Sequence, residues 1–156
     1  FFSEFVNLPE PFDGLFISLN LTEVDAESDV PSAAGVFTVP FRKLADSTRN
    51  LSIGYDKGKV DMRLSLAQRS DYLDYLADDD IETTVDNLNY DNIRFTDDHS
   101  QIDFTAKYYL TDNFTLKLDL ININDEPEFY YWGGPSRLSQ YDEYGRSATI
   151  GFTYKY

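Results

Sequence analysis

The sequence predicts an all-β fold, an antiparallel meander of about seven strands. The main observation is the alternation of apolar and polar residues with period 2, which is clearest in the last stretch of the chain. One side of that stretch carries Ala148, Ile150, Phe152, Tyr154 and Tyr156, and the other carries Thr149, Gly151, Thr153 and Lys155. A second observation is that such stretches are separated alternately by short turn-forming sequences and by long polar ones.

The predicted strands span about residues 1–8, 15–23, 49–56, 59–69, 100–110, 114–123 and 145–156. After the first strand, Pro9–Gly14 predicts a turn, because its two prolines cannot donate to a ladder and its glycine is free to take a positive φ. In the second strand every other residue from Leu15 to Leu21 is apolar. Long external loops are predicted at 24–48, 70–99 and 124–144, where the alternation fails.

Two hairpins follow from the parity of the apolar residues. In the first, we expect Tyr55 to pair with Val60 around a Lys57-Gly58 turn. In the second, the loop Thr111–Asn113 is expected to pair residue 107 with 117 and residue 105 with 119. Two lysines then face each other with acids nearby, and such a cross-strand charge ladder is expected to support the sheet structurally.

The two faces of these strands predict a segment of a transmembrane barrel. The polar face is too charged for a sandwich core and suits a hydrated lumen, and the aromatic content of 16% suits interfacial girdles. About seven strands with an apolar outer face would leave two open edges, which hydrocarbon does not tolerate. We therefore expect the chain to be the C-terminal part of a larger barrel. It opens without a signal peptide, as a mature or partial chain would.

Composition argues against other classes. A net charge of −15 disfavours nucleic acid as a partner, and the absence of cysteine excludes disulfides and thiolate metal sites. His99 is the only histidine, and no phosphate-cradling loop, nucleophile elbow or metal-ligand helix is present. We therefore predict no enzymatic activity, no cofactor and no metal site.

Several motifs resemble the C-terminal barrel region of TonB-dependent outer-membrane receptors. They are Leu8–Gly14, Arg69–Leu73, Asn122–Pro127, the aromatic run Phe129–Gly133 and Arg137–Arg146 followed by the terminal strand. The resemblance implies a barrel of about 22 strands in the bacterial outer membrane, of which this chain would be roughly the last seven. The family's partners would be the remaining barrel strands, a plug domain that is absent here, outer-membrane lipid and the energy-coupling protein TonB. The implied function is import of a scarce large nutrient, a carbohydrate, a ferric siderophore or cobalamin.

Aromatic residues near polar donors are the predicted ligand-binding candidates. One group is Tyr130, Tyr131, Trp132, Arg137, Gln140 and Tyr141, and a second is Tyr72 and Tyr75. Either group has a structural alternative: the first could shape the loop against the rim, and the second could mark the membrane interface. The region 71–98 contains ten acidic residues and one basic residue, Arg94, and is expected to be a solvated loop rather than a calcium or iron-complex site.

A different class of function remains as an alternative. Leu118–Phe129 partly matches the calcium-binding linker between cadherin repeats, and the acidity and β-content agree with it. The match is a single short motif, and acidic motifs expected earlier in such a repeat cannot be placed. A calcium-bound adhesion module predicts two packed sheets, whereas a barrel segment predicts one open, curved sheet.

Overall fold

The computed structural model describes residues 8–32, 35–76 and 93–156. Apart from one 3-10 turn, η1 (Phe12–Gly14), its regular structure consists of strands in three antiparallel sheets. The predicted all-β antiparallel fold is confirmed. Within the described ranges no sheet closes into a barrel.

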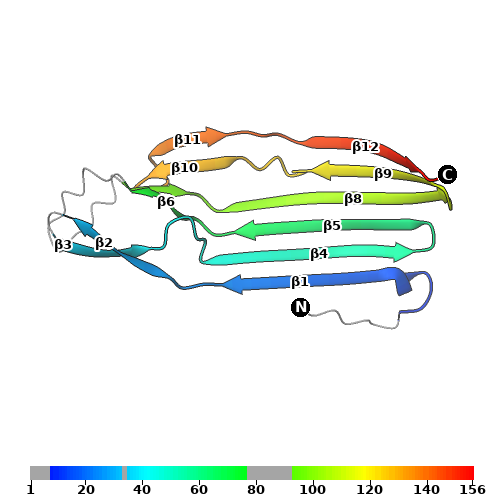
Figure 1. Ribbon diagram of the computed structural model, residues 1–156, viewed down its shortest axis with the longest axis horizontal. Helices are drawn as coiled ribbons and strands as arrows, with labels where there is room; N and C mark the ends of the chain where they lie inside the picture. Colours follow the sequence, from blue (N-terminus) through cyan, green and yellow to red (C-terminus); the bar gives the residue numbers. More distant parts are fainter. Residues whose placement is uncertain (1–7, 33–34, 77–92) are drawn as a thin grey trace.

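The largest sheet has six long strands that lie side by side (Figure 1). In spatial order they are β1 (Leu15–Glu23), β4 (Ser47–Lys57), β5 (Val60–Arg69), β8 (His99–Thr111), β9 (Phe114–Ile121) and β12 (Ser147–Tyr154). The strand predicted at 15–23 has these bounds, and the other five lie within about two residues of their predicted bounds. The strand predicted at 1–8 lies outside the described residues except for Leu8, which is not in a strand.

The long strands are joined by tight turns at one end of this sheet. Residues Asp112-Asn113 connect β8 to β9, and the predicted pairing of Lys107 with Lys117 is confirmed. The predicted register of the first hairpin is wrong by two residues, because Lys57 pairs with Val60 and Tyr55 pairs with Met62. Gly58 takes a φ of 62° and begins the turn one residue later than expected, so Lys57 stays in the ladder. A shift of two residues preserves the faces.

The three long connections were predicted to be loops without strands. Instead, their described residues contain six further strands. β2 (Glu27–Ser32) and β3 (Gly35–Pro40) form a separate hairpin, and a four-stranded sheet has the order β11 (Leu138–Asp142), β10 (Glu128–Trp132), β7 (Ile93–Thr96), β6 (Tyr72–Leu76). Strands of four to six residues show too few alternations for a period to be recognised. Both groups extend beyond the end of the long sheet that is opposite the tight turns (Figure 1). Residues 77–92 of the loop predicted at 70–99 lie outside the described part.

The buried apolar residues of the described chain all lie in these connections. Val39 of β3 packs with Leu73, Leu76 and Ile93 of the β6–β7 hairpin, and Phe95 lies against them. The amide of Lys43 donates a hydrogen bond of 2.7 Å to the carbonyl of Leu73, which ties the connection after β3 to β6. The connections therefore have their own small core.

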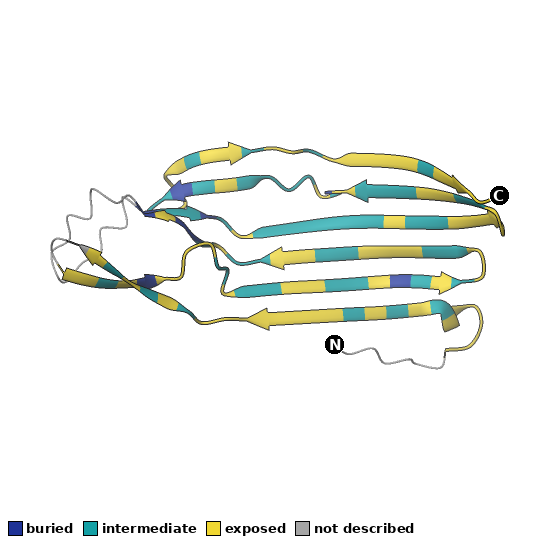
Figure 2. Cartoon of the chain, viewed as in Figure 1, coloured by how far each residue is buried: buried dark blue, intermediate teal, exposed yellow. Residues whose placement is uncertain are grey.

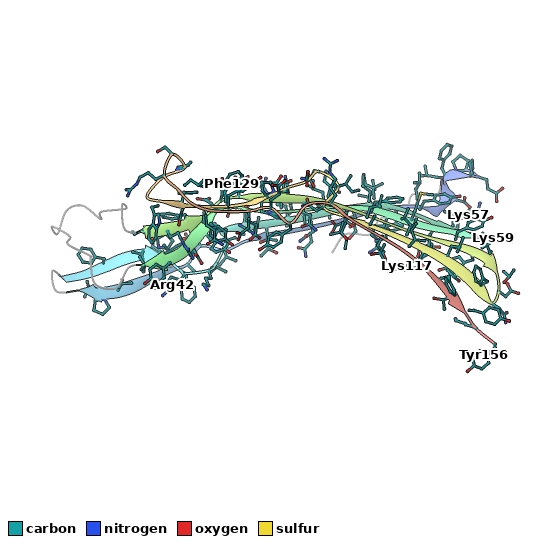
Figure 3. The ribbon with its side chains drawn as sticks, turned by 90° about the horizontal axis from the view of Figure 1, so that it is seen from above. Arg42, Lys57, Lys59, Lys117, Phe129 and Tyr156 are labelled. Atoms are coloured by element: carbon teal, nitrogen blue, oxygen red, sulfur yellow. The ribbon has the colours of Figure 1, made fainter. Side chains whose placement is uncertain are left out.

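The long sheet instead leaves an apolar face uncovered. Paired residues form continuous rows across all six strands, one of which is Ile17, Ile53, Leu64, Phe104, Leu120 and Ala148. Ile17 is 61% exposed and Ile150 in a neighbouring row is 82% exposed. The residues of the long strands are almost all exposed or half-buried (Figure 2), and seen from above the sheet is a single layer (Figure 3).

The opposite face of the long sheet is polar and internally bonded. The hydroxyls of Ser52 and Ser65 lie 3.0 Å apart on paired positions of β4 and β5. Lys107 pairs with Asp61 at 2.8 Å, and Lys117 pairs with Asp119 on its own strand at 2.9 Å. Each of the two facing lysines thus has a carboxylate partner, in agreement with the predicted structural charge ladder.

One row of the polar face depends on a glycine. Phe16, Gly54 and Arg63 occupy paired positions on β1, β4 and β5. The Phe16 ring lies across the Gly54 backbone, and the Arg63 guanidinium carbon is 5.2 Å from the ring centroid. Only a residue without a Cβ leaves room for the ring, because a Cβ on Gly54 would lie 2.2 Å from Phe16 Cζ.

We expect Gly54→Ala to lower the free energy of unfolding by about 1–3 kcal/mol, because the ring must leave its position on the strand. The measurement is chemical denaturation of the purified protein. Gly151→Ala is the matched control, since no heavy atom lies within 4 Å of its Cβ position. An equal loss when Gly54→Ala is made in a Phe16→Ala background would show that the ring is not the cause.

Candidate functional site

The four-stranded sheet gathers the predicted ligand residues. Tyr72 and Tyr75 lie on β6, Tyr130–Trp132 on β10, and Gln140 and Tyr141 on β11, while Arg137 lies in the turn between β10 and β11. The two candidate groups are far apart in sequence, and β7 places them on one sheet because it pairs with both β6 and β10.

Strand pairing divides the candidates between the two faces of this sheet. One row runs through Gln140, Tyr130, Thr96 and Tyr72, and the next runs through Trp132, Arg94 and Tyr75. Directly paired residues of antiparallel strands share a face. We call the face that carries Tyr72, Tyr75, Tyr130, Trp132 and Gln140 the aromatic face.

Tyr131 and Tyr141 lie on the opposite face of the sheet. Tyr131 is 8% exposed, stacks on Phe95 at a centroid distance of 5.6 Å, and donates a hydrogen bond of 3.2 Å to Asp71. Tyr141 packs on Phe129 at 4.9 Å. The exposed Arg137 accepts a hydrogen bond from the Trp132 amide through its carbonyl, which closes the hairpin. A ligand role for these three residues stays a prediction, and in the structure their observed contacts pack or shape the sheet.

Two arginines that sequence reasoning did not select hold the aromatic face in place. The Arg94 guanidinium lies 5.3 Å from the Tyr130 centroid, and its Nε donates to Asp74 at 2.7 Å. The Arg69 guanidinium lies 5.0 Å from the Tyr72 centroid and pairs with Glu128 at 3.7 Å. The isolation of Arg94 among acids was the available sequence signal. Its partner Asp74 was expected in a solvated loop but is 8% exposed, because it occupies a bulge of β6.

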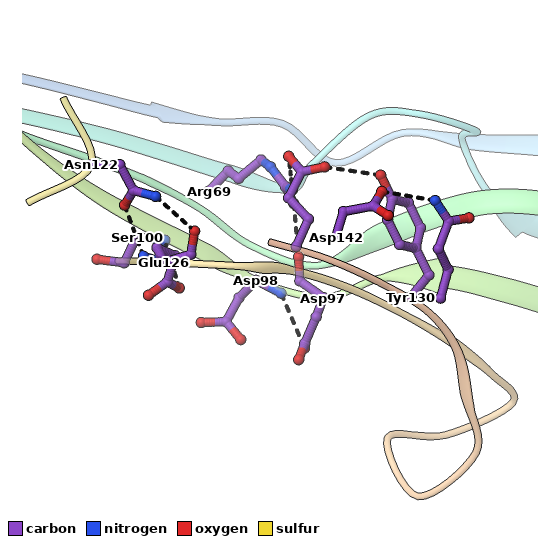
Figure 4. Close-up of polar contacts among 10 residues, drawn as sticks. Arg69, Asp97, Asp98, Ser100, Asn122, Glu126, Tyr130 and Asp142 are labelled. Atoms are coloured by element: carbon purple, nitrogen blue, oxygen red, sulfur yellow. Dashed lines mark hydrogen bonds and ion pairs between the residues drawn. The ribbon is translucent and has the colours of Figure 1, made fainter. Parts of the chain in front are cut away.

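Hydrogen-bonding groups line the β10–β11 side of the aromatic face. The Tyr130 hydroxyl donates to Glu128 at 2.9 Å, and Gln140 Nε2 donates to Asp142 at 2.7 Å (Figure 4). Burial raises the pKa of Tyr130 to about 12, and the bonded Glu128 carboxylate adds to the rise. The period-2 spacing of Glu128, Tyr130 and Trp132 is a pattern that identifies this row in retrospect.

The Trp132 and Tyr75 rings form the open end of the aromatic face. Their centroids are 6.4 Å apart and their planes are nearly perpendicular. Tyr75 is 42% exposed, and the Arg42 guanidinium lies 5.8 Å from its ring. Arg42 also donates a hydrogen bond to the Asp74 carbonyl at 3.5 Å. This part of the face offers flat apolar surface next to charged and amide groups, the combination that ligand sites use.

The Asn122–Glu126 segment, which suggested a calcium linker, forms a tight turn between β9 and β10. Asn122 is 5% exposed with a φ of 56°, and its amide group bonds the backbone of Glu126 and of Gly145. The Glu126 carboxylate accepts from the amide of Ser100 at 3.3 Å, and Asn124 bonds the backbone of β8. Among the described residues no group of three or more His, Asp or Glu is placed to hold a metal ion. The polar side chains of this segment therefore hydrogen-bond to backbone groups of the turn and of neighbouring residues.

Comparison with known proteins found no matching family model, no matching curated protein and no matching solved structure. Over residues 8–32, 35–76 and 93–156, no helix is long and apolar enough to span a membrane.

Tyrosine titration tests the packing of β10. Burial also raises the pKa of Tyr131 to about 12, with the neighbouring Asp71 carboxylate as a further cause. The folded state holds both protons more tightly than the unfolded chain, so stability falls as the pH rises from about 10, the ordinary tyrosine pKa, towards 12. The measurement is the absorbance change on tyrosine ionisation as the pH is raised. In the folded protein, we expect Tyr130→Phe and Tyr131→Phe each to reduce this change at the high-pH end of the titration. In urea-unfolded protein, the same variants should reduce it near the ordinary tyrosine pKa, and identical effects in the folded and unfolded proteins would contradict the packing.

Proposed function

We propose that this chain forms strands of the transmembrane β-barrel of a TonB-dependent receptor in the bacterial outer membrane. The observation that carries the proposal is the long sheet itself. It presents a continuous, exposed apolar face on one side and a bonded polar face on the other. Lipid outside and a hydrated lumen inside are the environments that these two faces suit.

The dimensions of the long strands support a membrane-spanning role. β1, β4 and β5 contain 9, 11 and 10 residues, and a tilted transmembrane strand needs about 9–11. An apolar face that runs across six strands would be unusual in water, because monomers rarely expose contiguous apolar patches larger than a few hundred Å². A hydrocarbon solvent removes that cost.

The edges of the long sheet indicate further strands. In the described part of the chain β1 pairs only with β4, and β12 pairs only with β9. Unpaired backbone groups in hydrocarbon cost several kcal/mol each, so both edges require partners. We infer that the remaining strands of a barrel of about 22 supply them and that the polar face surrounds a plug domain.

The two ends of the sheet have different proposed roles. Tight turns are typical of the periplasmic side and long connections of the extracellular side of such barrels. The four-stranded sheet with its aromatic face would then lie outside the cell, where it would capture a scarce nutrient too large for porins. Energy delivered through TonB would remodel the plug and allow import of a carbohydrate or ferric siderophore.

A charge on the apolar face tests the lipid environment. We expect Ile17→Arg to make folding into lipid bilayers less favourable by about 2–4 kcal/mol, because the charge would lie in hydrocarbon. Asn20→Arg, on the polar face of the same strand, is the control and should change stability by less than about 0.5 kcal/mol. If the apolar face met water, Ile17→Arg would be tolerated as well as Asn20→Arg, and the lipid assignment would fail.

Fractionation of the native source tests the larger receptor. We expect antibodies against residues 93–156 to detect the chain in the outer membrane, within a detergent-extracted polypeptide several times longer than 156 residues. Intact-mass measurement without proteolysis identifies the species. Recovery of an 18.0 kDa protein from the aqueous fraction would overturn the proposal, and a melting point that then rose with calcium would favour the adhesion module.

A further inference from the structure

We propose that the aromatic face binds an uncharged oligosaccharide rather than an anionic iron complex. This inference rests on the proposed receptor function and identifies the class of its ligand. The groups that decide it are the rings of Tyr75 and Trp132, the hydrogen-bonding row of β10 and β11, and the charge balance among three arginines and three carboxylates.

The geometry offers a stacking surface followed by a row of directed polar groups. Trp132 and the 42%-exposed Tyr75 meet edge to face at one end. Glu128 lies four residues before Trp132 on the same face of β10, so the row is about 13 Å long. Sugar rings combine apolar C–H surfaces with hydroxyls, and an aromatic surface beside carboxylate and amide groups matches both. The row is longer than one sugar ring.

The tyrosine and glutamine groups between these ends are already oriented. Glu128 accepts from the Tyr130 hydroxyl, and Asp142 accepts from Gln140. A carboxylate has lone pairs for further donors after accepting one hydrogen bond, so both acids can accept from hydroxyls of a ligand. Preorganised acceptors of this kind select for donors, which sugars supply and carboxylate or catecholate groups do not.

Charge argues against an anionic ligand. The carboxylates of the face, Asp74, Glu128 and Asp142, equal its arginines in number, which are Arg42, Arg69 and Arg94. Arg94 is committed to Asp74, and Arg69 is committed to Glu128 and to the Asp97 carbonyl. Their guanidinium groups lie over Tyr130 and Tyr72, so an anion that paired with Arg94 or Arg69 would have to displace internal partners.

Acidic residues on the other side of the same sheet also disfavour an anion nearby. Asp97 and Asp98 follow β7 and Asp71 precedes β6, and their carboxylates lie around the Tyr131 hydroxyl on the face opposite the aromatic face. Burial raises the pKa of Asp97, and the neighbouring carboxylates of Asp98 and Asp71 add to the rise. An uncharged ligand avoids this field, whereas an anionic iron complex requires a positive surplus to offset it.

Calorimetric titration of the detergent-extracted protein tests the inference. The neutral probes are maltohexaose, cellohexaose and mannohexaose, and the anionic probe is ferric enterobactin. We expect at least one neutral probe to bind with an affinity that is the same at low and high salt. Trp132→Leu and Tyr75→Leu should each weaken that binding about tenfold or more. Phe129→Leu is the matched control, since Phe129 is 40% exposed on the opposite face of β10, and it should leave affinity unchanged.

The possible outcomes separate this inference from the receptor proposal. Binding of ferric enterobactin alone, binding of no neutral probe, or equal losses in Tyr75→Leu and Phe129→Leu would overturn the oligosaccharide assignment. An outer-membrane protein with any of these results would still be a receptor. A chain recovered in the aqueous fraction would end the receptor proposal whatever the probes show.

Discussion

The structure depends on an apolar face that no described part of the chain covers. In the long sheet, Ile17, Leu64 and Ile150 stand on rows that run across strands, and no second layer packs on them. A sheet usually gains its stability by burying one face. Here that burial must come from outside the described chain, so the solvent of the apolar face determines whether the fold is stable. Lipid is the solvent that we propose for this face.

The same constraint explains the chemistry of the opposite face. A single-layer sheet has no core between two layers to hold its strands together. In the long sheet, contacts between side chains of the polar face hold neighbouring strands together instead. Lys107 binds Asp61, Ser52 meets Ser65, and Phe16 occupies the gap that Gly54 provides. Such contacts join neighbouring strands one pair at a time. Among the described residues, the buried apolar side chains lie in the connections outside the long sheet, in and around the small core that contains Leu73.

Much of the long sheet could be predicted from the sequence, because alternation over eight or more residues determines which side of a strand each residue occupies. The pairing of Lys107 with Lys117 followed from the loop between them. The register at Tyr55 was missed because parity alone does not distinguish a shift of two residues. The strands of the connections were missed for another reason: Tyr72–Leu76 contains a bulge at Asp74 and has almost no period to read.

The candidate site shows a similar division between local pattern and long-range pairing. Aromatic composition was enough to select Tyr75 and Trp132, which are 57 residues apart in the sequence. Their contact required β7, whose four residues pair with both of their strands. The contacts of Arg94 could not be predicted for the same reason, since its partners Asp74 and Tyr130 lie on the two strands that flank β7. The aromatic residues of the candidate face could be selected from the sequence, but the pairing of the short strand β7 with β6 and β10 determines which of them lie close together. In this chain it joins rings to charges that are already paired, which leaves surface for an uncharged ligand and little attraction for an anion.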